Sequence, residues 1–259
     1  EIITREKVGI LLQTQEEYLQ IKSRCLSAKT IVSPSVLSAQ EIDFWVKKTV
    51  PINLSSFEEV RYFIKHHPGV PLSFRIDLTK HGRQRTGIKT YQLSELAGLL
   101  KREGITPYSF HMYVGTSSSC KKVLKNSEAA LSIFKRFFPK AAGINLGGGF
   151  KFDYAAPLAD QKHFPWGEYF IGLKKQLAKY EIPDHVKIIL EPGRDIFADA
   201  GVLLLSVKRI IADKSNVKIA TDGSYVYVPS ATVRNRQHKV HFFRKDFHGR
   251  KISRKSGFL

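Results

Sequence analysis

Three consecutive glycines follow a short apolar run in the segment Ile144-Asn-Leu-Gly147-Gly148-Gly149-Phe150. Glycine has no Cβ, so neighbouring backbone N–H groups can converge on an anion. If the apolar run is a barrel strand, a ligand phosphate would lie at its carboxyl end. The three glycines are therefore candidate phosphate-binding residues. A tight turn that requires positive φ angles is the alternative explanation.

A second apolar run, Ile188-Ile-Leu190, ends in Glu191-Pro-Gly-Arg194. The Arg194 guanidinium could hold a phosphate through two parallel hydrogen bonds. Glu191 could face a cationic ring nitrogen, because a nearby carboxylate favours the protonated form of that nitrogen. A surface salt bridge is the alternative role for this pair.

A third segment, Phe110-His-Met-Tyr-Val-Gly-Thr116, ends another run of strand-forming residues. Tyr113 could cover the face of a planar ligand, and Thr116 could bond a phosphate oxygen. His111, taken alone, is typical of a core histidine whose ring nitrogens have partners. In a parallel barrel the carboxyl ends of the strands lie on one face, so the three segments together predict a planar, phosphate-bearing cofactor.

Short strands alternate with helices as far as about residue 200, and strands separated by helices of this length must be parallel. We therefore predict an α/β fold with an incomplete (β/α)8 TIM-type barrel, followed by the start of a β-rich C-terminal domain. An open doubly wound sheet is the alternative. The predicted strands are 30–33, 51–54, 71–77, 108–114, 142–146 and 186–190. The predicted helices are 16–24, 38 onward, 56–66, 94–102, 121–138 and 168–180.

Two serines have the spacing of a helix capping box, in which Ser and Glu side chains satisfy free N–H groups. They are Ser38 with Glu41 and Ser56 with Glu59. After residue 200 the strand-like stretches 202–211, 217–222 and 226–233 have no helix between them. We therefore place the barrel at residues 1–200 and the β-domain at 201–259.

The chain has 259 residues, two cysteines (Cys25 and Cys120) and a formal net charge of +19. The cysteines lack metal-ligand spacing, which argues against a zinc site or a disulfide framework and favours a reducing, cytoplasmic compartment. No apolar stretch approaches the roughly 20 residues that a membrane span requires, so we expect no membrane partner. The basic stretch after Arg234 contains no nucleic-acid-binding motif, so we do not expect nucleic acid as a partner.

The ordered segments FHMYVGT, INLGGGF and EPGRDIFADAGVLLLSVKRI resemble the ornithine/diaminopimelate/arginine decarboxylases, which are fold type III pyridoxal-phosphate enzymes. The resemblance covers nearly the whole chain, and the EPGR segment is its most specific part. Upstream, VPLSFRIDL resembles the strand that brings an arginine to the cofactor, and Arg75 holds that position.

This resemblance implies a barrel plus a β-domain, pyridoxal 5'-phosphate as cofactor, and a homodimer with shared active sites for the full-length protein. The glycines would cradle the phosphate, and Glu191 would pair with the pyridine nitrogen. The cofactor-binding residues that it implies are Arg75, His111, Tyr113, Thr116, Gly147, Gly148, Gly149, Glu191, Gly193 and Arg194.

The chain departs from the family pattern at three places. The family's cofactor-holding lysine lies on the first barrel strand, and no such segment is found here; Lys7 is too close to the second unit, which Val8–Glu17 resembles. We therefore expect a fragment that lacks the first β/α unit, contains no identified catalytic residue and does not turn over alone. Tyr113 stands where the family usually has a histidine. Val228–Thr232 replaces the patch that grips the distal carboxylate in diaminopimelate enzymes.

The sequence thus predicts a pyridoxal-phosphate-dependent decarboxylase that removes the α-carboxylate from a basic amino acid or a derivative. Polyamine, diaminopimelate and siderophore biosynthesis all use substrates of this kind. The principal alternative is a non-catalytic relative that binds the cofactor or a partner protein. A racemase-like use of a similar barrel is a further one.

Overall fold

The computed structural model describes residues 5–6, 8–24, 29–79, 86–113, 115, 118–154, 163–198, 200–212, 216–228, 238–242 and 255–258. The chain divides into two compact units, and each is described by itself. Unit 1 comprises Glu1–Phe150 and Pro165–Pro192. Unit 2 comprises Lys151–Phe164 and Gly193–Leu259.

Unit 1 contains parallel strands that pair in chain order. β1 pairs with β2, a bridge from Val32 to Ile52 continues toward β3, and the sheet then runs β3-β4-β6-β7-β8. A doubly wound sheet reverses its strand order at a switch point, whereas a barrel does not. The predicted barrel-type fold is therefore confirmed. The strands are β1 (Ile10–Leu12), β2 (Thr30–Val32), β3 (Asn53–Leu54), β4 (Ser73–Asp77), β6 (Ser109–Met112), β7 (Gly143–Asn145) and β8 (Lys187–Ile189).

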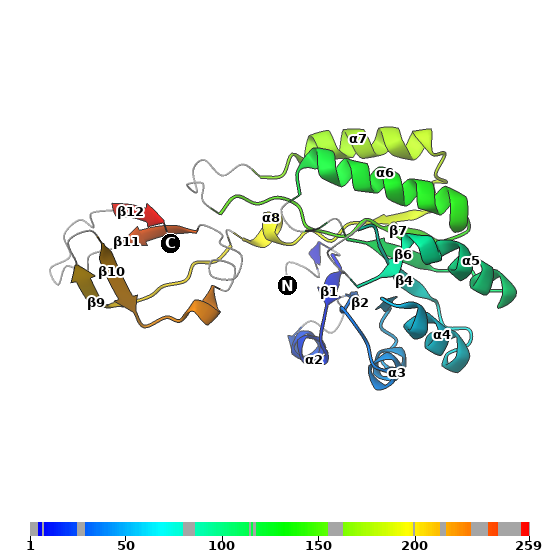
Figure 1. Cartoon of the computed structure of the whole chain (residues 1–259), viewed down its shortest axis with the longest axis horizontal. Coiled ribbons are helices and arrows are strands. Elements are labelled where there is room, and N and C mark those ends of the chain that lie inside the picture. Colours follow the sequence, from blue (N-terminus) through cyan, green and yellow to red (C-terminus); the bar gives the residue numbers. More distant parts are fainter. Residues whose placement is uncertain are drawn as a thin grey trace. The chain divides into compact units, whose positions relative to one another are not determined.

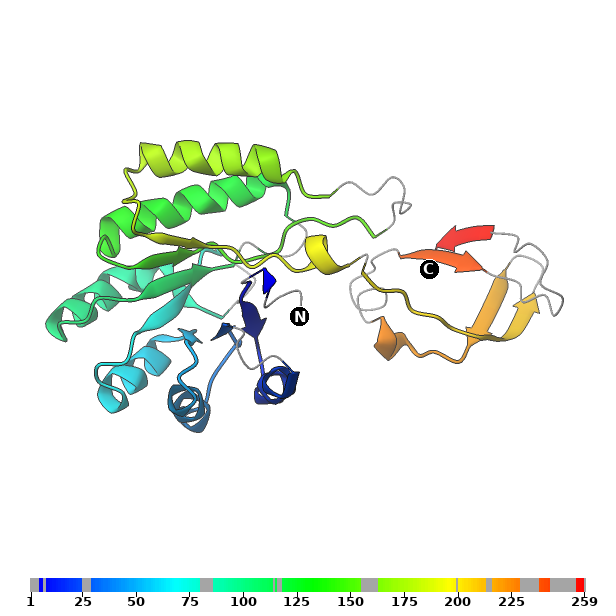
Figure 2. The same ribbon diagram turned by 180° about the vertical axis from the view of Figure 1, so that it is seen from behind.

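The barrel is incomplete within the described part of the chain, where neither β1 nor β8 pairs with a second strand on its outer side. A short strand, β5 (Ile88–Lys89), pairs with the end of β4 and was not predicted. Helices cover the outside of the sheet (Figures 1 and 2). They are α2 (Gln15–Arg24), α3 (Ala39–Lys47), α4 (Phe57–His66), α5 (Leu93–Arg102), α6 (Cys120–Phe137) and α7 (Trp166–Lys179). None of the described helices combines the length and the apolar character needed to cross a bilayer.

The apolar core of unit 1 lies between the sheet and the helices. The Phe74 and Phe110 rings come from neighbouring strands and are stacked, with centroids 6.3 Å apart. Both rings contact Phe138 at the end of α6, at 5.1 and 5.8 Å. Because side chains alternate along a strand, the residues on either side of each phenylalanine point to the other face, into the barrel.

The inner face of the barrel is polar. Ser73 pairs in register with Asn53 and Ser109, and Arg75 pairs with His111, which in turn pairs with Asn145. Barrel interiors are usually filled by branched apolar side chains. Burial of polar groups lowers stability unless they are hydrogen-bonded, so this interior is suited to a polar ligand. The buried polar residues of these strands are Asn53, Ser73, Asp77, Ser109, His111 and Asn145.

The two predicted capping boxes behave differently. Ser38 and Glu41 form both reciprocal hydrogen bonds, which confirms the first. Ser56 accepts from the Glu59 N–H, but the Glu59 carboxylate turns inward, so the second box is only half formed. This buried carboxylate instead accepts from Ser55 N at 2.6 Å and from Leu37 N at 3.0 Å. It thereby ties the segment after β2 to the end of β3.

Unit 2 contains the short helix α8 (Arg194–Phe197) and two antiparallel hairpins. The hairpins are β9 (Val207–Ala212) with β10 (Val217–Thr221), and β11 (Lys239–Phe242) with β12 (Lys255–Phe258). We predicted a strand over residues 202–211, but the observed strand β9 begins at Val207. Tyr225–Tyr227 forms a 3-10 turn, and most of the predicted strand 226–233 lies outside the described residues. The domain limits of 1–200 and 201–259 remain a prediction.

Replacement of Glu59 by alanine should lower the free energy of unfolding by about 3 kcal/mol, because two buried N–H groups lose a charged acceptor. Urea unfolding followed by circular dichroism measures this change. The control is Glu58→Ala on the same helix, where the side chain is exposed. Equal midpoints for the two variants would show that the Glu59 carboxylate does not hold the two segments together.

Candidate cofactor-binding site

Most of the predicted site residues lie at the carboxyl ends of four adjacent strands. Arg75 is in β4, His111 is in β6 with Tyr113 just after it, the glycines follow β7, and Glu191 follows β8. Backbone hydrogen bonds hold the last two ends together: Leu146 N donates to Ile189 O at 2.9 Å. The structure therefore brings these predicted residues to one edge of the sheet.

The glycine loop is wedged between the ends of the strands on either side of β7. Gly147 and Gly149 have φ angles of 69° and 95°, which favour glycine. A Cβ at Gly147, Gly148 or Gly149 would collide with the carbonyl oxygen of Met112, Glu191 or Gly115, respectively. The loop therefore requires glycine for two reasons: the positive φ angles of a tight turn, and the close approach of neighbouring backbone.

Two N–H groups of the loop are available for an anion. Gly147 N donates to Asn145 Oδ1 at 2.9 Å, and the Gly147 and Gly149 carbonyls accept from Glu191 N and Ser118 N. Within the described residues, the Gly148 and Gly149 N–H groups donate to no other residue. Adjacent backbone donors of this kind, in a loop with positive φ angles, form an anion-binding concavity.

Glu191 carries a buried carboxylate, with a side chain only 10% exposed. Asn145 Nδ2 donates to Oε1 at 2.8 Å, and His111 Nε2 lies 3.2 Å from Oε2. Burial, the largest single influence, raises the pKa of Glu191. His111, Asn145 and the Arg75 charge together outweigh it, so the net pKa lies below the ordinary value. Glu191 therefore stays ionised at neutral pH and can pair with a protonated ring nitrogen.

Tyr113 and Arg75 lie beside each other at the same edge. The Arg75 guanidinium carbon is 5.4 Å from the centroid of the Tyr113 ring, a cation–π distance. His111 is buried, and neither ring nitrogen has a well-aligned hydrogen bond within the described residues. Its Nε2 lies 3.2 Å from Glu191 Oε2, and the ring differs from a core histidine whose two nitrogens both have hydrogen-bond partners.

Three predicted site residues are not placed with this group. Thr116 lies outside the described residues. Gly193 precedes α8 and Arg194 begins it, and both belong to unit 2. Their contact with a phosphate remains a prediction.

Asn145 was not predicted as a site residue, although its side chain lies between Glu191 and the glycine loop. The available signal was a polar residue inside an otherwise apolar strand, two positions before the first glycine. An ion pair at the end of β4 was not predicted either. There Lys89 Nζ lies 2.5 Å from Asp77 Oδ2, and the Asp77 side chain is 3% exposed.

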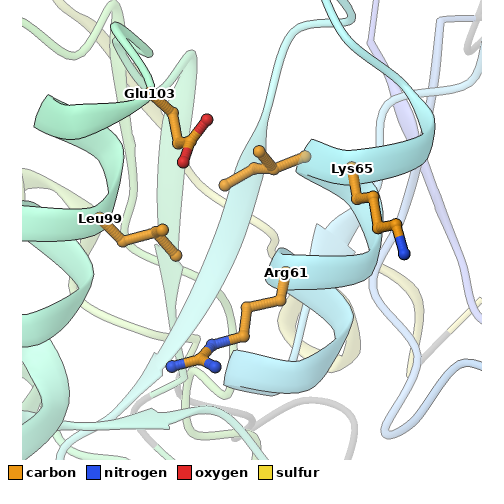
Figure 3. Close-up of a pocket in the computed structure, with 5 residues that line it drawn as sticks. Arg61, Lys65, Leu99 and Glu103 are labelled. Carbon is orange, nitrogen blue, oxygen red and sulfur yellow. The ribbon is translucent and has the colours of Figure 1, made fainter.

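A separate concave region of about 410 Å³ lies on the outer surface between α4 and α5 (Figure 3). Arg61, Lys65, Leu99 and Glu103 line it, together with Ile64. These side chains belong to the helical layer, from α4, α5 and Glu103 directly after α5. The region is therefore not part of the cluster at the strand ends.

Comparison with known proteins identifies the family. A sequence model of the family "Pyridoxal-dependent decarboxylase, pyridoxal binding domain" matches residues 13–198. The chain belongs to this family of pyridoxal-binding decarboxylase domains. The cofactor of the family is pyridoxal phosphate, as predicted.

Curated relatives of this pyridoxal-binding domain include diaminopimelate decarboxylases. The enzyme from Buchnera aphidicola subsp. Acyrthosiphon pisum is 21% identical over 68% of this chain and 45% of its own length. The enzyme from Streptomyces coelicolor is 23% identical over 75% of this chain and 47% of its own length. The chain thus spans about half the length of these relatives.

The solved structures of similar fold include decarboxylases that are named for different substrates. Diaminopimelate decarboxylase from Helicobacter pylori, complexed with L-lysine, has a TM-score of 0.78 at 19% identity and covers 95% of this chain and 66% of its own. Lysine/ornithine decarboxylase from Vibrio vulnificus, complexed with cadaverine, has a TM-score of 0.77 at 16% identity, with coverages of 99% and 73%. At these identities the likeness establishes the fold of the domain alone.

The Gly148→Ala substitution should destabilise the domain by roughly 2 kcal/mol or more, because the added Cβ meets the Glu191 carbonyl and forces the strand ends apart. Differential scanning fluorimetry would measure the shift in melting temperature. Gly167→Ala is the matched control: Gly167 lies in α7 with open space around it, and alanine favours a helix by up to about 1 kcal/mol. Equal melting temperatures for the two variants would show that the glycine loop is not closely packed against the neighbouring strand ends.

The Asp77–Lys89 pair should give stability that depends on pH. Burial raises the pKa of Asp77, but Lys89 and the Thr79 hydrogen bonds outweigh this and hold it below 3.8. The stabilisation is therefore present above pH 3.8 and is lost as the pH falls through the lower folded-state pKa. The difference in unfolding free energy between the native chain and Asp77→Asn should shrink over that window. A difference that is constant with pH would contradict the assignment.

Proposed function

We propose that this chain forms the cofactor-binding part of a pyridoxal-phosphate-dependent amino-acid decarboxylase that acts on a basic amino acid or a derivative of one. The observation that carries the proposal is Glu191, a buried carboxylate kept ionised by three neighbours at the carboxyl ends of parallel strands. Such a group suits a protonated pyridine nitrogen. When bound, pyridoxal phosphate supplies an electron sink for the charge left as the α-carboxylate departs.

In this proposal each part of the cofactor would have its own partner in the site. The Gly148 and Gly149 N–H groups would hold the phosphate, and the inward-facing Glu191 would pair with the ring nitrogen. Tyr113 would cover one face of the ring, where the neighbouring Arg75 limits its movement. Thr116 and Arg194 would add contacts to the phosphate, as the family resemblance implies.

The proposed class of substrate follows from the relatives. Their names include diaminopimelate, arginine and lysine/ornithine decarboxylases, all of which act on amino acids with a second charged or basic end. We further propose that this chain binds the cofactor without a covalent link, since no segment resembles the family's lysine-bearing strand. A probe that lacks the reactive aldehyde should therefore bind as well.

The test is equilibrium binding of pyridoxine 5'-phosphate to the 259-residue chain. Isothermal titration calorimetry in a phosphate-free buffer measures the affinity. We expect saturable binding that Glu191→Gln weakens roughly tenfold or more, because a charge-assisted hydrogen bond to the ring nitrogen is lost. The control is Glu181→Gln, an exposed carboxylate paired with Lys135. Absence of binding, or equal affinity in both variants, would overturn the cofactor assignment.

The substrate assignment has its own test. A protein that includes this chain together with the cofactor-holding lysine should release carbon dioxide from at least one of lysine, ornithine, arginine and diaminopimelate. Release can be measured with carboxyl-labelled substrates. Normal cofactor binding without release from any basic amino acid would favour a non-catalytic relative.

A further inference from the structure

Asn145 lies at the end of β7 and is completely buried. Both the nitrogen and the oxygen of its side-chain amide form hydrogen bonds. Nδ2 donates to Glu191 Oε1 at 2.8 Å, and Oδ1 accepts from Gly147 N at 2.9 Å. One side chain therefore connects the carboxylate proposed for the ring nitrogen with the first glycine of the proposed phosphate loop.

The chemistry of the amide fixes this arrangement. A carboxylate can only accept and a backbone N–H can only donate, so the residue between them must donate on one side and accept on the other. The amide meets both needs in one orientation only, because the flipped amide would place its oxygen against the carboxylate. An ionised aspartate would supply only the acceptor, and leucine would supply neither group.

Further contacts link the same two elements. Glu191 N donates to Gly147 O at 2.9 Å, so the backbone and the Asn145 side chain join Glu191 to the loop at two points. Asn145 is also in register with His111, which lies on the other side of the Glu191 carboxylate. Loss of the amide would free the carboxylate to rotate and would release the Gly147 N–H.

We infer that Asn145 is a positioning residue that holds the two ends of the cofactor site, the ring-nitrogen partner and the phosphate loop, at a fixed separation. The inference rests on the proposed function. Binding of the ring nitrogen thus depends on a side chain that does not itself contact the cofactor.

The experiment compares two probes with the full chain. Pyridoxine 5'-phosphate carries the ring nitrogen, and its 1-deaza analogue has a C–H group there instead. Asn145→Leu should weaken the binding of pyridoxine 5'-phosphate roughly tenfold or more. The same substitution should weaken the binding of the analogue by a smaller factor, because the analogue makes no hydrogen bond to Glu191 even in the native chain.

A second variant gives a readout that a merely structural role would not change. In Asn145→Asp the new carboxylate faces Glu191, and two adjacent carboxylates share a proton more readily as the pH falls. Binding of pyridoxine 5'-phosphate should therefore recover between about pH 8 and about pH 6 relative to the native chain. This variant also decides the question if Asn145→Leu does not fold.

Ser127→Ala is the matched control. It removes a buried hydrogen bond to the Tyr169 hydroxyl in the helical layer, at 3.2 Å, and should leave the affinity for both probes unchanged. Equal losses for both probes in Asn145→Leu, or an Asn145→Asp affinity that follows the native chain at every pH, would overturn the inference. If the native chain binds with Glu191 dependence and the Asn145 variants match it, only this inference fails. If the native chain binds neither probe, the proposed function fails as well.

Discussion

A carboxylate buried at the end of a parallel strand needs donors or positive charges around it, and the arrangement of the site follows from this constraint on Glu191. The neighbours of Glu191 come from three other strands: Arg75 from β4, His111 from β6 and Asn145 from β7. They reach one point because these three strands are in register. The sheet thus determines the charge of Glu191 as well as its position.

The fold separates stability from binding. Apolar burial is concentrated between the sheet and the helices, where Phe74, Phe110 and Phe138 contact one another. The inner face of the same strands carries serine, asparagine, histidine and arginine, which add little hydrophobic stabilisation. This division allows the interior to be polar without loss of the apolar core.

The sequence predicts the parts of the site that depend on local chemistry. Three glycines after a strand, a glutamate before Pro-Gly-Arg, and the Ser38 capping box can each be read from short segments, and the strand order follows from the alternation with helices. The role of Asn145 could not be predicted, because its partner Glu191 is 46 residues away and the contact depends on strand register. Glu59 was misassigned for a similar reason: its acceptor oxygens are used by Leu37, 22 residues earlier, as well as by Ser55.

The central claim is that Glu191 holds a protonated pyridine nitrogen at the carboxyl ends of the barrel strands. Nuclear magnetic resonance of ring-nitrogen-labelled pyridoxine 5'-phosphate bound to the chain tests it most directly, because the nitrogen chemical shift reports protonation. The account predicts that the bound nitrogen stays protonated at pH values where the free compound has lost its proton. A bound nitrogen that titrates like the free compound would contradict the account.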